Sequence, residues 1–284
     1  MDLEDLLRTC QKNLVGLDKE IQLILAAIDS QIAVIIEGES GTGKTELAKT
    51  IAKALNRPLF RVDGDENLTI THLRGWFDPP LVMKTGFGEE SYIPGPLVNA
   101  MKQGGLFFFN EVNRAPSESI NGVLSALDER QIEVPQLGHI KAKAEFYSLF
   151  ARNPIEYIGT NPLPEAFFDR CILIPLKHKS GYEARKIVQL RTNCSDEDLI
   201  TKIVHFTDQT RSSANFETGA SVRAAIQLTQ LLSNRPLVRD VVFPAIYAVY
   251  SGKVKLHPDI NNSLEDSLLE IAEPIFFPSF SKKS

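Results

Sequence analysis

The sequence predicts an α/β domain built on a parallel sheet, followed by a smaller domain made of helices. Two continuous apolar runs, residues 33–36 and 106–109, are typical of strands that are buried on both faces of a parallel sheet. A glycine-rich loop joins the first run to a stretch rich in helix formers. Beyond residue 180, apolar residues recur at helical spacing.

Local sequence patterns predict the individual helices and strands and the domain boundary. Residues 2–30 show helical spacing that is interrupted at Val15 and Gly16, and residues 177–181 are polar and turn-prone. We therefore place the domain boundary there, with an α/β domain over 1–178 and a helical domain with the C-terminal tail over 179–284. The sequence predicts strands over 33–36, 59–62, 106–109, 149–151 and 171–174, and helices over 46–55, 183–191, 196–207 and 221–232.

Net charge, the length of apolar runs and the spacing of the cysteines indicate the class of protein. The 284 residues carry a net charge of −5, and we find neither an N-terminal signal pattern nor an apolar run of about 18 residues. We expect a soluble cytoplasmic protein without a membrane span, and the acidic balance disfavours a dedicated nucleic-acid binder. Cys10, Cys171 and Cys194 are too few and too widely spaced to indicate a disulfide framework or a zinc site.

The glycine-rich loop has the spacing of a phosphate-binding loop. Backbone N–H groups of such a loop surround phosphates, Lys44 reaches the β and γ phosphates, and the Thr45 hydroxyl can ligate Mg²⁺. The helix that follows directs its N-terminus at the phosphates. We therefore expect a nucleotide with Mg²⁺ at the loop residues Gly38, Glu39, Ser40, Gly41, Thr42, Gly43, Lys44 and Thr45.

A second polar pair follows a buried strand. The run 106–109 ends at Asn110 and Glu111, and the carboxyl ends of strands are where ligands bind in open α/β sheets. Glu111 can orient and activate the water that attacks the γ-phosphate. The alternative is an acid that only caps a helix at the strand end.

Five further segments have the spelling of known motifs: Gly95-Pro96-Leu97, Asn110-Glu111-Val112-Asn113-Arg114-Ala115-Pro116, Asn153-Pro154-Ile155-Glu156 with Gly159-Thr160, Leu163-Pro164-Glu165-Ala166 with Asp169-Arg170, and Gly219-Ala220-Ser221-Val222-Arg223-Ala224. With them the chain resembles the MoxR family of AAA+ ATPases, whose motifs occur in the same order over roughly residues 14 to 230. The resemblance implies an AAA+ α/β domain with a helical lid. It also implies a ring, expected to have six subunits, with ATP sites at the subunit boundaries.

The resemblance also implies residue roles. Asn153 is expected to be the polar sensor that helps place the attacking water, and Arg170 the arginine finger that reaches a neighbour's γ-phosphate. Arg223 is expected to be the lid residue that senses the nucleotide, and Val15 and Gly16 lie beside the adenine base in the family. Planar guanidinium groups suit phosphoryl transfer because charge spreads over several oxygens in its transition state.

Each role has a structural alternative. Asn153 precedes a proline and could only form a turn, and Arg223 could be a solvated helix residue. Arg170 could pair with Asp169 or Glu165. Arg114 has two open interpretations, contact with the adjacent subunit or bracing of the acidic strand end.

Position 110 departs from the family pattern. The family has an aspartate there, which holds Mg²⁺ through its water shell, whereas this chain has Asn110. An amide oxygen can still accept a hydrogen bond from such a water, but it brings no negative charge. We therefore predict slowed or tightly regulated hydrolysis with nucleotide binding retained.

Three segments outside the motifs carry weaker expectations. Residues 63–95 are long for a simple connection and rich in glycine and aromatics, which either grip a client or pack on their own domain. Residues 131–145 resemble a second insertion. The apolar tail, residues 274–280, is expected to dock on the chain's own helical domain.

Two function classes follow. The first is an ATP-driven enzyme that remodels a protein client, and MoxR relatives commonly act on proteins with a von Willebrand factor A domain. The second is a nucleotide-gated assembly or scaffold subunit with little turnover. A nucleic-acid motor and a small-molecule kinase are disfavoured, the first by the acidic charge and the second by the combination of Asn153, Arg170 and Arg223.

Overall fold

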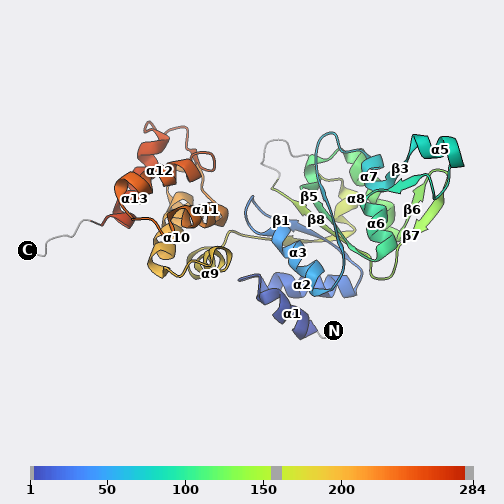
Figure 1. Ribbon diagram of the computed structural model, residues 1–284, viewed down its shortest axis with the longest axis horizontal. Coiled ribbons are helices and arrows are strands. Elements are labelled where there is room, and N and C mark those ends of the chain that lie inside the picture. The colour runs from blue at the N-terminus through green and yellow to red at the C-terminus, as the bar shows by residue number, and fades with distance from the viewer. Residues whose placement is uncertain (1–2, 155–161, 279–284) are drawn as a thin grey trace, which may run out of the picture. The chain divides into compact units, whose positions relative to one another are not determined.

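The computed structural model describes residues 3–154 and 162–278, and it divides into two compact units. One unit comprises Met1–Glu39 and Gly43–Lys177, and the other comprises Ser40–Thr42 and His178–Ser284. Each unit has a hydrophobic core of its own. Figure 1 shows the sheet within the first unit and the helical bundle that forms the second.

A five-stranded parallel sheet forms the centre of the first unit, in the order β2-β5-β8-β1-β9. The predicted strands are confirmed, with β8 extended by three residues and each of the others by one. β5 and β8 lie inside the sheet and are buried along their whole length, as the continuous apolar runs indicate. The strands are β1 (Ala33–Glu37), β2 (Leu59–Asp63), β5 (Leu106–Asn110), β8 (Tyr147–Arg152) and β9 (Cys171–Pro175).

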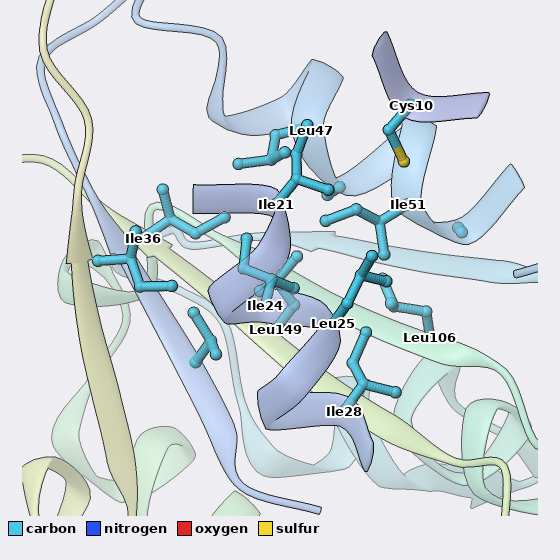
Figure 2. Close-up of a cluster of buried hydrophobic side chains, with 14 of the residues drawn as sticks. Cys10, Ile21, Ile24, Leu25, Ile28, Ile36, Leu47, Ile51, Leu106 and Leu149 are labelled. Atoms are coloured by element: carbon cyan, nitrogen blue, oxygen red, sulfur yellow. The ribbon is translucent and has the colours of Figure 1, made fainter. Parts of the chain in front are cut away.

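One face of the sheet is covered by α1 (Leu3–Gln11), α2 (Asp18–Asp29) and α3 (Lys44–Ala54), which confirms the helices expected there. Figure 2 shows the cluster that joins these helices to the sheet, with Ile24 and Leu25 of α2 beside Leu149 of β8. Because α3 begins directly after the phosphate loop, this packing fixes the direction in which the loop faces.

The opposite face is covered by α6 (Pro96–Gln103) and α7 (Ser117–Asp128). Side chains from alternate positions of the same strands reach this face, among them Ile35, Phe107 and Phe109. The ring centroids of Phe150 on β8 and Phe167 in α8 (Glu165–Phe168) lie 4.7 Å apart, edge to face. The two cores hold the carboxyl ends of β5 and β8 at one edge of the sheet.

Residues 63–95, which are long for a simple connection, contain short elements of their own. They fold into α4 (Ile70–Arg74), β3 (Gly75–Phe77), α5 (Pro79–Thr85) and β4 (Tyr92–Pro94), with β3 and β4 paired in an antiparallel hairpin. Phe77 packs against Phe87 and Tyr92, whereas Trp76 and Phe87 stay largely exposed. The second insertion forms the hairpin of β6 (Gln131–Val134) and β7 (Gly138–Lys141).

The second unit is helical, as predicted, with one short strand pair in addition. Phe206 and Tyr250 form an edge-to-face pair in its core, and the tail residues Phe276 and Phe277 pack into the same cluster. Residues 279–280 of the tail lie outside the described residues. The elements are α9 (Gly181–Thr192), α10 (Glu197–Ser212), α11 (Val222–Leu232), α12 (Arg239–Tyr250), α13 (Leu264–Phe276), β10 (Phe216–Thr218) and β11 (Lys255–Leu256).

No helix within the described part of the chain combines the length and the apolar character needed to cross a bilayer.

Candidate nucleotide site

The phosphate loop connects the end of β1 to the start of α3. Gly41 and Gly43 have φ angles of 87° and 102°, in the left-handed region that favours glycine, which explains two of the fixed glycines. Gly38, Thr42 and Lys44 are buried, whereas Glu39 and Ser40 are exposed. Such a loop, which ends at a helix N-terminus, offers backbone N–H groups to an anion.

The loop lysine converges with the predicted sensor residue. Lys44 Nζ donates to the carbonyl oxygens of Gly38 and Glu39, at 2.5 and 3.0 Å, and to Asn153 Oδ1 at 2.9 Å. Lys44 is only 7% exposed, so its ammonium needs such partners. Asn153 follows Arg152 at the end of β8, which is in register with Glu37 at the end of β1. The parallel pairing of these strands therefore brings together two residues that are 109 positions apart.

Glu111 lies at the end of β5 in an unusual backbone conformation. Its φ of 51° places a non-glycine residue in the left-handed region, where backbone strain is characteristic of functional sites. Arg114 Nη1 donates to Glu111 Oε2 at 3.0 Å, and this partner raises the pKa of the Arg114 guanidinium. The structure thus shows Arg114 bracing the acidic strand end, which is one of its two expected roles.

The predicted metal residues supply oxygen ligands of the kind that Mg²⁺ prefers. Asn110 lies two residues after Phe108 and four after Leu106 on β5, so the three side chains share one face of the sheet. This is the face covered by α3, and Thr45 lies in the first turn of that helix. Among the described residues, no group of three or more His, Cys, Asp or Glu side chains is arranged to hold a metal. A hydroxyl and an amide oxygen beside a phosphate loop fit a cation that is held mainly by phosphates and water.

Two further polar residues at this edge were missed by the sequence analysis. Asn113 is 1% exposed, and its Nδ2 donates to the backbone oxygen of Asn153 at 3.0 Å, which ties the turn after β5 to the sensor position. Asp63 Oδ1 accepts a hydrogen bond from Asn110 Nδ2 at 2.7 Å. Asn113 lies within the segment 110–116, and Asp63 ends a strand next to β5, so the rule that ligands meet strand ends could have found both.

Arg170 lies elsewhere. It precedes β9, and so it stands at the amino edge of the sheet, opposite the phosphate loop. Its Nε donates to both carboxylate oxygens of Asp128 at 2.6 Å, and its Nη1 donates to the carbonyl oxygen of Ala166 at 2.6 Å. The expected alternative partners, Asp169 and Glu165, are not its ion-pair partners, because the end of α7 brings Asp128 closer.

The remaining predicted residues lie in other elements of the chain. Val15 and Gly16 are half-buried in the turn between α1 and α2, where Gly16 has a φ of 69°. Arg223 is exposed in the first turn of α11. Partial burial lowers the pKa of Lys253, and the charge of Arg223 lowers it further. The motif residues Ile155, Glu156, Gly159 and Thr160 lie outside the described residues.

Comparison with known proteins agrees with this geometry. Residues 33–171, which span the central sheet and the phosphate loop, match the AAA domain of the dynein-related subfamily. An uncharacterized protein of Staphylococcus saprophyticus is 30% identical over 215 residues, which cover 73% of this chain and 81% of that protein. The chain therefore contains an AAA domain. Its AAA domain supports an ATPase, and the resemblance to the MoxR family in particular remains a prediction.

Other relatives match a similar length of the chain. An uncharacterized protein of Staphylococcus epidermidis is 31% identical over the same length, and one of Staphylococcus aureus is 27% identical over 223 residues, covering 76% of this chain and 84% of that protein. A crystal structure from Cytophaga hutchinsonii, described as a candidate ATPase, matches with a TM-score of 0.54 and 21% identity, covering 95% of this chain and 92% of that one. This last match supports the fold.

Proposed function

We propose that this AAA protein binds Mg-ATP at the phosphate loop and hydrolyses it. The observation that carries the proposal is the convergence of the loop lysine, Lys44, with the Asn153 amide at 2.9 Å. A buried ammonium at a helix N-terminus, next to a polar side chain from a different strand, suits the γ-phosphate and the attacking water. Glu111 follows the strand between β8 and β2, within the same edge of the sheet.

In this proposal each residue has a distinct role. Lys44 holds the β and γ phosphates, Asn153 orients the attacking water, and the Glu111 carboxylate accepts the proton that this water loses. The Mg²⁺ ion, when bound, neutralises charge that develops on the phosphate oxygens. Thr45 and Asn110 would hold it through their side-chain oxygens. The Arg114 guanidinium keeps the Glu111 carboxylate in place until the water arrives.

The site is completed by a second subunit. Arg170 lies at the edge of the sheet opposite its own phosphate loop, so it can act only on the nucleotide of a neighbour. AAA proteins commonly assemble into rings, and we propose a ring of six in the cytoplasm. Arg223 then senses the nucleotide from the helical unit, and Val15 and Gly16 contact its base.

The client is a protein. The MoxR resemblance favours remodelling or maturation of a partner that carries a von Willebrand factor A domain, driven by the change of conformation that accompanies nucleotide binding and hydrolysis. The net charge of −5 argues against nucleic acid as the client.

One observation favours a second candidate function. Asn110 brings no negative charge to the metal site, so the chain could trade turnover for a long-lived ATP-bound state and act as a nucleotide-gated scaffold.

The experiment is Mg²⁺-dependent ATP turnover of the purified chain across a wide range of protein concentrations, with Glu111→Gln as the inactive reference. Turnover per subunit that rises with concentration and vanishes in the variant supports the ATPase with shared sites. Tight ATP binding without turnover would favour the scaffold, and failure to bind ATP at all would refute both.

A further inference from the structure

Asp63 and Asn110 form a cross-strand pair at the carboxyl edge of the sheet. The two residues end neighbouring parallel strands, β2 and β5, and lie in register with each other. Asn110 is only 7% exposed, and its Nδ2 donates to Asp63 Oδ1 at 2.7 Å. Asp63 therefore lies directly beside Asn110, one of the proposed metal residues, on the side of β5 that is farther from β1 and the phosphate loop.

The chemistry of the pair fixes which way the amide faces. An ionised carboxylate has only acceptor atoms, so the amide must present its NH₂ group to Asp63. The two terminal atoms of a planar amide diverge, and Oδ1 of Asn110 is consequently directed away from β2. In the sheet order, β8 and β1 lie on that other side of β5. Without the carboxylate, the amide could turn over and present two hydrogen atoms to the metal site.

The carboxylate is itself held firmly. Arg61 donates from Nε and Nη2 to Asp63 Oδ1, at 3.1 and 2.6 Å. Gly64 N–H donates to the backbone oxygen of Asn110 at 2.7 Å, and a Cβ on Gly64 would lie only 2.0 Å from the backbone oxygen of Glu111. The glycine thus permits a close approach that clamps the ends of β2 and β5 together.

We propose that Asp63 is a positioning residue for the metal site. It holds the Asn110 amide with its oxygen toward the water shell of Mg²⁺, while its own carboxylate also pairs with Arg61. Residues that hydrogen-bond to a metal-binding side chain orient it in this way and alter metal affinity. The inference rests on the proposed function of the same site.

The test measures how much Mg²⁺ increases the affinity for ATP, with a fluorescent ATP analogue titrated in EDTA and in Mg²⁺. Asp63→Ala removes both the acceptor and the charge, and we expect the gain from Mg²⁺ to fall about tenfold while affinity in EDTA stays unchanged. Asp63→Asn keeps an acceptor, and we expect a fall of about threefold. Asp65→Asn removes a neighbouring exposed carboxylate and should leave both affinities unchanged.

A second variant covers the case in which Asp63→Ala does not fold. The exchange variant with Asp63→Asn and Asn110→Asp keeps one amide and one carboxylate facing each other, and it should restore the gain from Mg²⁺ to at least the original level. Binding of Mn²⁺ to the ATP-loaded proteins, followed by EPR, should weaken in Asp63→Ala and recover in the exchange variant.

The outcomes separate this inference from the proposed function. If Asp63→Ala keeps the full Mg²⁺ gain, or if Asp63→Asn keeps it where Asp63→Ala does not fold, the inference is overturned while ATP hydrolysis stands. If the original protein binds ATP with a Mg²⁺ gain but shows no turnover, the ATPase fails and Asp63 is still tested. Absence of any Mg²⁺ gain in the original protein would overturn the positioning role as well.

Discussion

Two arginine–carboxylate pairs lie at opposite edges of the same sheet, and the groups that surround them differ. Glu111 and Arg114 meet at the carboxyl edge at 3.0 Å, and Asp128 and Arg170 meet at the amino edge at 2.6 Å. All four side chains are between 32% and 46% exposed, so neither pair contributes much to stability. Their roles therefore depend on their positions.

The carboxyl edge is prepared for a ligand. Glu111 adopts a strained backbone conformation, and the buried Lys44 ammonium lies at the same edge as the Asn153 amide. At the amino edge, by contrast, Arg170 Nε reaches both oxygens of Asp128, and no phosphate loop is near. Five residues of β9 separate the two edges, about 16 Å at about 3.3 Å per residue. An arginine side chain cannot span that distance, which supports the proposal that Arg170 acts on the nucleotide of another subunit.

Lys44→Ala is expected to have the largest effect on the site at the carboxyl edge. Loss of a buried ammonium that holds two phosphates should cost about 3 kcal/mol, or about a hundredfold in ATP affinity, and abolish turnover. The measurement is calorimetric titration with ATP. Lys49→Ala, exposed on the same helix, is the matched control and should bind ATP normally. Equal affinity of Lys44→Ala and the original protein would refute the site.

Glu111→Gln should separate chemistry from binding. Replacing a general base by an amide is expected to lower turnover by about a thousandfold, while ATP affinity changes little because the residue does not hold phosphate. Steady-state phosphate release and ATP titration together give the two values. Glu118→Gln, exposed in the first turn of α7, is the control. Turnover that survives in Glu111→Gln would assign the base to another residue.

Arg170→Ala tests whether a residue at the amino edge of the sheet contributes to turnover. We expect turnover to fall about a hundredfold at concentrations where the protein assembles, because a guanidinium no longer stabilises the transferring phosphoryl group. ATP affinity of the isolated subunit should not change. Arg235→Ala, exposed in the helical unit, serves as the control. A loss of ATP affinity in the monomer would place Arg170 in its own subunit's site.

The smallest effect concerns a thiol beside the amino-edge pair. Burial raises the pKa of Cys171 to about 12, Arg170 lowers it, and Asp128 raises it. At about pH 8 only about one thiol in ten thousand is ionised, and alkylation should be slow. Asp128→Asn should lower this pKa and speed alkylation, whereas Arg170→Ala should raise it and slow the reaction.

Mass spectrometry of the Cys171 peptide after iodoacetamide treatment, between about pH 7 and about pH 10, measures this effect. The same direction of change in both variants would mean that access to the thiol, and not charge, controls its reactivity.

The sequence predicted the strands and the phosphate loop because both are written in local patterns. Apolar runs mark β1, β5 and β8, and within the phosphate loop glycines occupy the two positions with positive φ, Gly41 and Gly43. The contacts of Asp63 and of Asp128 could not be predicted in the same way, because each joins residues more than 40 positions apart through the register of strands or the end of a helix. The short helices and strands within residues 63–95 were not predicted, because they are shorter than the periodic patterns that reveal such elements.

The most direct test of the shared site is to mix Glu111→Gln with Arg170→Ala. In a randomly mixed ring, about a quarter of the interfaces pair an intact Glu111 with an intact Arg170 from the neighbour. We predict that the two inactive proteins recover measurable ATP turnover on mixing. If mixed rings form and bind ATP but recover no turnover, the claim that Arg170 completes a neighbour's site is contradicted.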